Sequence, residues 1–313
     1  MLTFLARRLA LLVPVAFGVT LIVFLLIRLI PGDPAVNLLG IHQTPALLAQ
    51  LHAEMGLDQA LPAQYLIFLS HLLHGDLGTS YFYGQSVISL VSDRLPPTLF
   101  LLTYASILTT VVAFPAAILA ALRRNSIWDQ VVRFAFVFGI SLPAYWLGII
   151  LILVFAIAIP VFPVAGYGTT FLDHLHYLFL PAATIALGVI PLVLRAMRTS
   201  MIDVLRADFM DTARAKGLPP RVVLLRHGVR NALLPAITVL GVNIGWLIGG
   251  TVIIENVFAI PGLGQLMIFS VSARDYPTIQ AVTLLFAVLV VLVNLATDAL
   301  YLILDPRVRG SVR

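Results

Sequence analysis

The stretch Asp211–Pro235 reads DTARAKGLPPRVVLLRHGVRNALLP and decides how this chain is organised. It separates two long apolar segments and is strongly basic, through Arg214, Lys216, Arg221, Arg226 and Arg230. Ala213 and Ala215 precede Gly217, and a helix that ends on small residues and a glycine can press its backbone against another surface. A loop that only orients a protein in the membrane explains the charge. It does not explain the Ala-x-Ala-x-Gly pattern or the helical run that follows.

The composition is that of an integral membrane protein. Of the 313 residues, 60% are hydrophobic, and the mean hydropathy is +1.04. The chain has no cysteine, which excludes disulfides, a thiol nucleophile and a cysteine-based metal site. The net charge of +5 does not indicate nucleic-acid binding, because the basic residues are sorted by membrane side.

Six apolar segments have the length that a bilayer requires, about 20 residues each. The first, 9–30, is too long for a signal-peptide core and lacks a small-x-small cleavage site, so we expect an uncleaved span. The others are 97–122, 131–159, 178–197, 233–254 and 278–304. The sequence therefore predicts an all-α polytopic membrane protein with six transmembrane helices.

The distribution of Lys and Arg orients these spans. With a cytoplasmic N-terminus, sixteen of the 19 basic residues lie on the cytoplasmic side, and the exceptions are Arg28, Arg94 and Arg274. Because cytoplasmic loops are enriched in Lys and Arg, both termini are predicted to be cytoplasmic.

The first external region, 31–96, is predicted to hold two amphipathic helices on the outer membrane surface. One begins at Thr44-Pro45 and stops at Gly56. The other runs from Pro62 to Leu73 and halts at Gly75.

Several motifs resemble one family. TARAKG, followed by RHGVRNALLP, is similar to the cytoplasmic loop of binding-protein-dependent ABC transporter permeases, in the branch that imports peptides, nickel and glutathione. The general family pattern is Glu-Ala-Ala, three residues, then Gly, and this chain has Asp211, Thr212 and Ala213 at the first three places. Leu234-Pro235 also comes about five residues later than in the general pattern, and both departures fit the peptide branch. The likeness extends along the whole chain through PGDP (31–34), HGDLGTS (74–80), ENVFAIPGLG (255–264), RDYP (274–277) and DPRVR (305–309).

The resemblance implies the type-1 permease fold of ABC importers. It divides the chain into residues 1–94 (the first transmembrane helix and the external region), 95–304 (the permease domain) and 305–313 (a cytoplasmic tail). Within a loop of about 200–231, a coupling helix would dock into a cleft on an ATP-binding subunit. The docking residues implied are Asp211, Thr212, Ala213, Arg214, Ala215, Lys216, Gly217 and Leu218.

The implied function is a permease subunit of an ATP-driven importer in the bacterial inner membrane, which works by alternating access. The implied partners are a second homologous permease, two ATP-binding subunits inside, an external (periplasmic) solute-binding protein and the lipid bilayer. Dipeptide, oligopeptide, glutathione and nickel importers share these motifs, so a nickel importer is an alternative to a peptide importer. A self-sufficient channel or ion-coupled carrier, and an assembly scaffold without a pathway, are rivals from other classes.

No enzyme can be assembled from these residues. A phosphate-binding loop requires Gly-Lys, and the single lysine, Lys216, follows Ala215. His-Glu-x-x-His and Gly-x-Ser-x-Gly are both absent. We expect no cofactor, and the energy for transport must come from another chain.

Glycines and intramembrane polar residues are further candidates. Gly241, Gly245 and Gly249 repeat every four residues, form one stripe on the fifth span and predict close helix packing. In the family that helix borders the pathway between two permeases. Glu255 lies at the outer end of this span; we expect a hydrated anchor, with a pathway role as the alternative. For Asp298 in the sixth span, with Asn294 one turn earlier, we expect a structural pairing or a transport role.

Six of the seven histidines fall on the external side: His42, His52, His71, His74, His174 and His176. His174-x-His176 would suit a metal ion, but loop histidines without a cysteine or carboxylate cluster are more often solvated. The tripeptide GYG (166–168) resembles a potassium-filter sequence, but it occurs once and lacks the preceding threonine, so we interpret it as chance.

Overall fold

The computed structural model describes residues 13–25, 33–39, 44–54, 56–132, 134 and 142–304. Within these ranges the secondary structure is helical, apart from an isolated antiparallel bridge between Thr79 and Ser86. The all-α prediction is therefore confirmed. The predicted tail 305–313 with its DPRVR motif lies outside the described residues, as do Arg7, Arg8, Arg28 and His42.

Four described helices are long and apolar enough to cross a membrane, and they match the second, fourth, fifth and sixth predicted spans. They are Val87–Leu122, Phe179–Leu205, Pro220–Gly245 and Tyr276–Leu300. The first and third predicted spans correspond to shorter apolar helices, Val13–Leu25 and Ala144–Ala158. Both of these predicted ranges, 9–30 and 131–159, extend into residues that the structure leaves undescribed.

The long helices continue beyond their apolar segments. Helix α5 spans Val87–Leu122, α9 spans Phe179–Leu205, and α14 spans Tyr276–Leu304. The helical run predicted after Gly217 consists of α11 (Pro220–Val222), the π-helix η3 (Val223–Val229) and α12 (Arg230–Val257). Hydropathy marks only the part of a helix that suits hydrocarbon, whereas backbone hydrogen bonding continues into water until a breaker intervenes.

The two helices predicted within residues 31–96 form. Helix α3 (Pro45–Glu54) begins after Thr44, whose hydroxyl accepts a hydrogen bond from the Leu47 backbone at 3.3 Å, and Gly56 follows it with φ 64°. Helix α4 (Leu61–Leu73) is followed by Gly75 with φ 75°. A short helix that the sequence did not indicate, α2 (Pro34–Leu39), precedes both.

The chain divides into two compact units. One comprises Leu99–Ile260 and the residues from Val290 onward; the other comprises the residues up to Thr98 together with Pro261–Leu289. Helices α5 and α14 contribute to both. The second unit also holds α13 (Leu263–Ala273), which the sequence analysis missed because eleven apolar residues are too few for a span.

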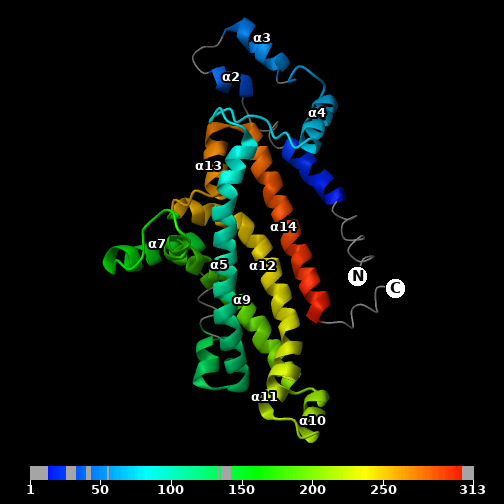
Figure 1. Cartoon of the computed structure of the whole chain (residues 1–313), viewed down its shortest axis with the longest axis vertical. Helices are drawn as coiled ribbons and strands as arrows, with labels where there is room; N and C mark the ends of the chain where they lie inside the picture. The colour runs from blue at the N-terminus through cyan, green and yellow to red at the C-terminus, as the bar shows by residue number, and fades with distance from the viewer. Residues whose placement is uncertain are drawn as a thin grey trace. The chain divides into compact units, whose positions relative to one another are not determined.

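The first unit is built around α9 and α12, which lie side by side (Figure 1). Small residues of α5 pack against them, since Ala113, Ala117 and Ala120 share a core with Met197 and Ala232. Helices α7 (Ala144–Ile152) and α8 (Phe171–Tyr177) and the π-helix η2 (Leu153–Ala158) also belong to this unit. Helices α10 (Asp208–Ala215) and α11 lie where the chain passes from α9 to α12 (Figure 1).

Candidate functional site

The predicted docking segment is the helix α10 followed by a sharp turn. Lys216 is its C-cap residue, and the Gly217 N–H donates to the carbonyl of Arg214 at 2.9 Å. Gly217 has φ 73°. A Cβ at this φ is strained by about 1 kcal/mol, which explains the glycine. The predicted positive φ at this helix end is confirmed.

One face of α10 is buried against its own chain. Met210 and Ala213, three residues apart, pack on Val223 to form a small core, with Val204 and Leu205 beside it. Ala213 is only 5% exposed. The cover of η3 over Ala213 is enough to explain its small side chain, and the predicted contact of Ala213 with a docking partner stays a prediction.

The face of α10 next to the buried one is exposed. Phe209 is 44% exposed, although it lies between Asp208 and the buried Met210, and Leu218 is 36% exposed. Thr212 and Lys216 follow Phe209 at helical spacing and are also exposed. We call Phe209, Thr212 and Lys216, together with Leu218 from the turn after the helix, the outer face of α10.

Sequence reasoning missed Phe209. Adjacent residues on a helix point about 100° apart, and in this structure Met210 and Ala213 enter the core while Phe209, at the edge of the same stripe, stays exposed.

The charges of this region are all in contact with solvent. Arg214, Lys216, Arg221, Arg226 and Arg230 are exposed. Arg214 pairs with Asp211 at 2.8 Å, but both side chains are more than half exposed, so the pair adds little stability. The sidedness of these basic residues stays a prediction.

The three glycines of the fifth span have different environments. A Cβ on Gly241 would lie 2.2 Å from Oγ1 and 2.5 Å from Cγ2 of Thr297, so α12 and α14 approach closely there. A Cβ on Gly245 would meet only Val290 Cγ1, at an ordinary 3.7 Å, and one on Gly249 would meet nothing within 4 Å. Close packing within the chain thus requires only the first glycine of the stripe.

Glu255 is fully buried, so the predicted hydrated anchor is wrong. The burial follows from the turn after α12, where the Glu255 carbonyl accepts from the Ile260 N–H at 2.8 Å and the Phe258 carbonyl accepts from Gly166 at 3.0 Å. The Phe258 ring covers Gly148, where a Cβ would lie 3.1 Å away. The ENVFAIP motif therefore forms a packed turn.

The two predicted polar residues of α14 differ in exposure. Asn294 is exposed, whereas Asp298 is half-buried and takes part in a polar interaction. The structure brings neither of them to the outer face of α10. Their functional roles stay predictions.

A groove of about 570 Å³ runs between α9 and α12. Its lining residues repeat at helical spacing, and several are polar: Leu192, Arg195, Ala196, Thr199, Ser200 and Asp203 on α9, and Pro235, Val239 and Asn243 on α12. Ionisable side chains on membrane helices face a bundle interior or a water-filled cavity. The sequence analysis missed this groove, although the spacing of Arg195, Thr199 and Asp203 on one helix face would have indicated it.

The side chains of His174 and His176 do not converge. His174 Nδ1 donates to the Tyr167 carbonyl and His176 Nε2 to the Val161 carbonyl, both at 2.8 Å. Among the described residues no group of three or more His, Cys, Asp or Glu side chains could hold a metal ion. His174 is half-buried, so the prediction of a simply solvated side chain is wrong for that ring, whereas His176 is exposed and keeps one hydrogen bond to the backbone.

The GYG tripeptide is part of this packed loop. The Tyr167 ring stacks on His174 with centroids 3.8 Å apart. Gly166 and Gly168 have φ of 107° and 77°, which explains both glycines. Helix α8 begins beside them at a capping box, in which the N–H of Thr170 and then its hydroxyl hold the pKa of Asp173 below its ordinary value.

In the second unit a buried carboxylate joins two of the quoted motifs. Asp275, from RDYP, accepts hydrogen bonds from Ser80 Oγ at 2.5 Å, the Tyr81 N–H at 3.0 Å and Thr278 Oγ1 at 2.7 Å. Ser80 ends the HGDLGTS motif. Arg274 precedes this carboxylate in the left-handed conformation (φ 57°), which turns the chain from α13 into α14.

Asp275→Ala is expected to destabilise the protein by about 3 kcal/mol or more, because it leaves buried donors without an acceptor. A thermal melt of the purified protein measures the effect. Asp58→Ala is the control at an exposed carboxylate, where a change within about 0.5 kcal/mol is expected. Equal melting temperatures for the two variants would contradict the structural role of Asp275.

Two families match the chain in succession. The one described as "Binding-prot-dependent transport system membrane comp, N-term" matches residues 1–102. The one described as "Binding-protein-dependent transport system inner membrane component" matches residues 113–310.

Curated relatives match over almost the whole chain. The di/tripeptide transport system permease protein DppB of Pseudomonas aeruginosa (strain UCBPP-PA14) is 40% identical, over 99% of each chain. The glutathione transport system permease protein GsiC of Pectobacterium atrosepticum is 38% identical, also over 99% of each chain. The oligopeptide transport system permease protein AppB of Bacillus subtilis (strain 168) is 38% identical, over 98% of this chain and 99% of its own.

Among solved structures, a chain of the MetNI methionine ABC transporter in an inward facing conformation is similar, with a TM-score of 0.54. The match covers 70% of this chain and 97% of that chain, at 16% sequence identity. At this identity the likeness concerns the fold, and it agrees with the permease fold expected from the motifs.

Proposed function

The chain belongs to the family of binding-protein-dependent transport system inner membrane components, and from this premise we propose that it works as one of two permeases in an ATP-driven importer of short peptides. Family membership makes it a membrane-spanning permease subunit. Its energy source, its solute and its partners within the complex are what we propose.

The outer face of α10 is the observation that carries the proposal. Helix α10 lies where α9 turns back into α12 (Figure 1). Phe209 on this helix and Leu218 in the turn after it are exposed apolar side chains, and Lys216 lies between them in sequence. An exposed aromatic residue ringed by polar ones is typical of a protein interface. We assign this face to an ATP-binding subunit, whose movement displaces α10 and with it the ends of α9 and α12.

The groove between α9 and α12 supports a pathway for short zwitterionic peptides. Arg195 and Asp203 supply opposite charges to the groove. They lie eight residues apart on α9, which is about 12 Å along a helix. A short peptide carries an amine and a carboxylate at its two ends, so both ends find a complementary charge in the groove. The relatives named as di/tripeptide, glutathione and oligopeptide permeases favour the same solute class.

A second permease and a solute-binding protein complete the proposed importer. Gly245 and Gly249 leave room on α12 for a neighbouring helix. The external helices α3 and α4 fall within residues 1–94 and are assigned to the side that receives the solute-binding protein. Residues 95–304 are assigned to the pathway and to coupling.

Uptake by cells that lack this chain tests the proposal. Restoring the chain is expected to restore ATP-dependent uptake of a labelled dipeptide, with other dipeptides competing and nickel not competing. Competition by nickel ions alone would favour a metal importer. Uptake by vesicles that contain only this chain would establish a channel or an ion-coupled carrier instead.

Single cysteines test the orientation without background, because the chain has none. The sorting of basic residues predicts that cysteines at the exposed positions Gln59 and Leu172 react with an impermeant maleimide added outside intact cells. Cysteines at Arg124 and Leu218, also exposed, are expected to react only after the cells are opened. Labelling of Leu218→Cys from outside would remove the basis for docking at α10.

A further inference from the structure

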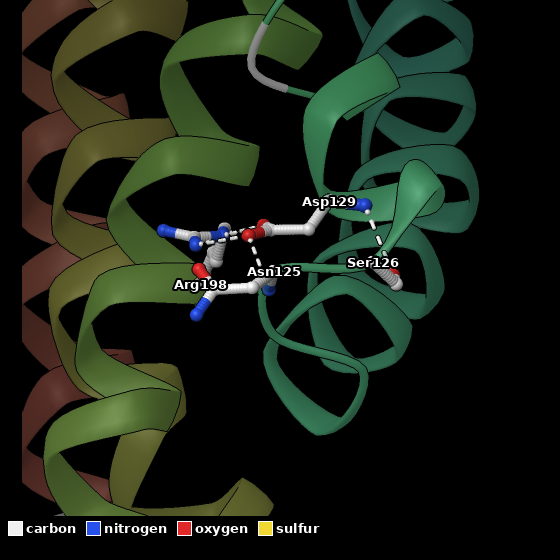
Figure 2. A network of polar contacts seen from close by, with 4 residues as sticks. All are labelled: Asn125, Ser126, Asp129 and Arg198. Carbon is white, nitrogen blue, oxygen red and sulfur yellow. Dashed lines mark hydrogen bonds and ion pairs between the residues drawn. The ribbon is translucent and has the colours of Figure 1, made fainter.

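A buried ion pair joins the turn after α5 to α9 (Figure 2). Arg198 Nε donates to Asp129 Oδ1 at 2.5 Å, and Arg198 Nη2 donates to Oδ2 at 2.8 Å. The Asp129 side chain is fully buried, and that of Arg198 is 17% exposed. Two parallel bonds to one carboxylate fix the direction of the contact as well as its length.

The turn itself is organised around the same carboxylate. The backbone N–H of Asn125 donates to Asp129 Oδ2 at 3.0 Å (Figure 2), and Asn125 has φ 63°. Asp129 in turn donates its own N–H to Ser126 Oγ at 3.4 Å. We call residues 123–132, which include this turn and the start of the following helix, the hairpin.

The apolar contacts around this pair are poorly suited to fixing a register. Ala117, Ala120 and Ala121 of α5 pack on Met197 and Met201 of α9. Alanine and methionine surfaces are smooth or adaptable and tolerate sliding. A buried bidentate pair, by contrast, is satisfied in one alignment alone, and fixing register is the best-attested use of buried polar contacts.

Arg198 lies between a weak point of α9 and the proposed docking helix. Pro191 is inside α9 and lacks the N–H of a regular helical bond, so the helix bends most easily there. Arg198 comes seven residues later, and α9 ends at Leu205, which is about 10 Å beyond Arg198. Helix α10 begins at Asp208.

We propose that Asp129 and Arg198 are positioning residues that make the hairpin and the segment 192–205 of α9 move as one body when α10 is displaced. Without the pair, displacement of α10 is absorbed by bending at Pro191 and by sliding over the alanines of α5. When the pair is present, the displacement of α10 is transmitted to the membrane-spanning helices. The inference rests on the proposed function, because it takes α10 as the point where movement enters.

Pulsed EPR on the permease alone tests the mechanical side of the proposal. Spin labels are attached to cysteines at the exposed positions Ile127 and Arg206, in a chain free of other cysteines. A narrow distance distribution is expected, and Asp129→Asn and Arg198→Lys should each broaden it about two-fold, since lysine cannot bind the carboxylate through two fixed donors. Equal widths in all three proteins would overturn the proposal. No ATP-binding subunit is needed, so this result is independent of the proposed function.

Proteoliposomes with the complete importer test the coupling side of the proposal. At equal amounts of assembled complex, each variant is expected to hydrolyse on the order of five-fold more ATP per labelled dialanine imported. The variant that combines Asp129→Asn with Arg198→Lys should be no worse than the poorer single variant, because both changes break the same link. If the double variant hydrolyses more ATP per dialanine by the product of the two single effects, the two residues act separately and the proposal is overturned.

Val193→Ala separates coupling from stability. Val193 is buried in the same core and has no polar side-chain atom with which to replace or disturb the hydrogen bonds of the ion pair. This variant is expected to lower the yield of folded permease with no change in ATP per dialanine. If it raises that ratio as much as Asp129→Asn does, the pair is merely structural and the proposal fails. Absence of ATP-dependent uptake in the unmodified complex would instead count against the proposed function.

Discussion

Phe209→Ala is expected to release the ATP-binding subunits and to abolish uptake while the permease stays folded in the membrane. Phe209 is 44% exposed on α10, so its truncation removes little from the chain's own core. Aromatic residues at the centre of an interface typically contribute about 2 kcal/mol or more, a loss of about thirty-fold in affinity. Co-purification of the ATP-binding subunit in mild detergent and uptake at matched membrane levels are the measurements.

Met210→Ala is the matched control for Phe209→Ala. Met210 is the next residue but is fully buried against Val223, so its truncation should cost about 2–5 kcal/mol of stability. At equal amounts of folded permease, the Met210 variant is expected to keep its partner. If both variants retain the partner and normal uptake, the outer face of α10 is not the docking site.

Two further changes separate docking from orientation. Gly217→Val strains a residue at φ 73° but meets no chain atom within 4 Å, so it is expected to impair coupling more than folding. Neutralising Arg221 and Arg226 together should be nearly silent for docking if their charge serves orientation. If the double Arg variant inserts poorly into the membrane and Gly217→Val has no effect on uptake, the loop serves only to orient the protein.

Gly241→Leu is expected to destabilise the isolated permease by about 3 kcal/mol or more. Its Cβ alone would lie 2.2 Å from Thr297 Oγ1, and both α12 and α14 would have to shift to make room. The midpoint of thermal unfolding in detergent gives the size of the effect. Thr297→Ala removes Oγ1 and Cγ2, two of the three atoms that a Cβ on Gly241 would meet. Combined with the smaller change Gly241→Ala, it should therefore restore part of the stability that Gly241→Ala alone loses.

Gly249→Leu is the control on the same stripe. No chain atom lies within 4 Å of a Cβ there, so the isolated permease should melt as before. If a second permease packs on this region of α12, Gly249→Leu should weaken the association of the pair, which cross-linking in membranes detects. Equal destabilisation by the two variants would contradict the structure, in which Gly241 lies close to Thr297 and Gly249 has no chain atom within 4 Å of its Cβ position.

The sequence by itself determined the fold class and the family. Apolar runs of bilayer length and the motifs around Gly217 can each be read within one segment of the chain, without knowing how the segments pack. The starts and stops of α3 and α4, and the positive φ of Gly217, could be predicted for the same reason. A cap, a turn glycine and a hydrophobic period are all local signals.

The tertiary structure decided what each side chain faces. Ala213 belongs to the chain's own core, Phe209 beside it on α10 is exposed, and Glu255 is buried in a packed turn. Asp129 and Arg198 are 69 residues apart in the chain, and Ser80 and Asp275 are 195 apart. No periodicity connects such positions, because their contacts depend on how the helices pack against one another. The sequence pattern of a helix indicates which of its sides is buried, but not which residues of another helix that side contacts.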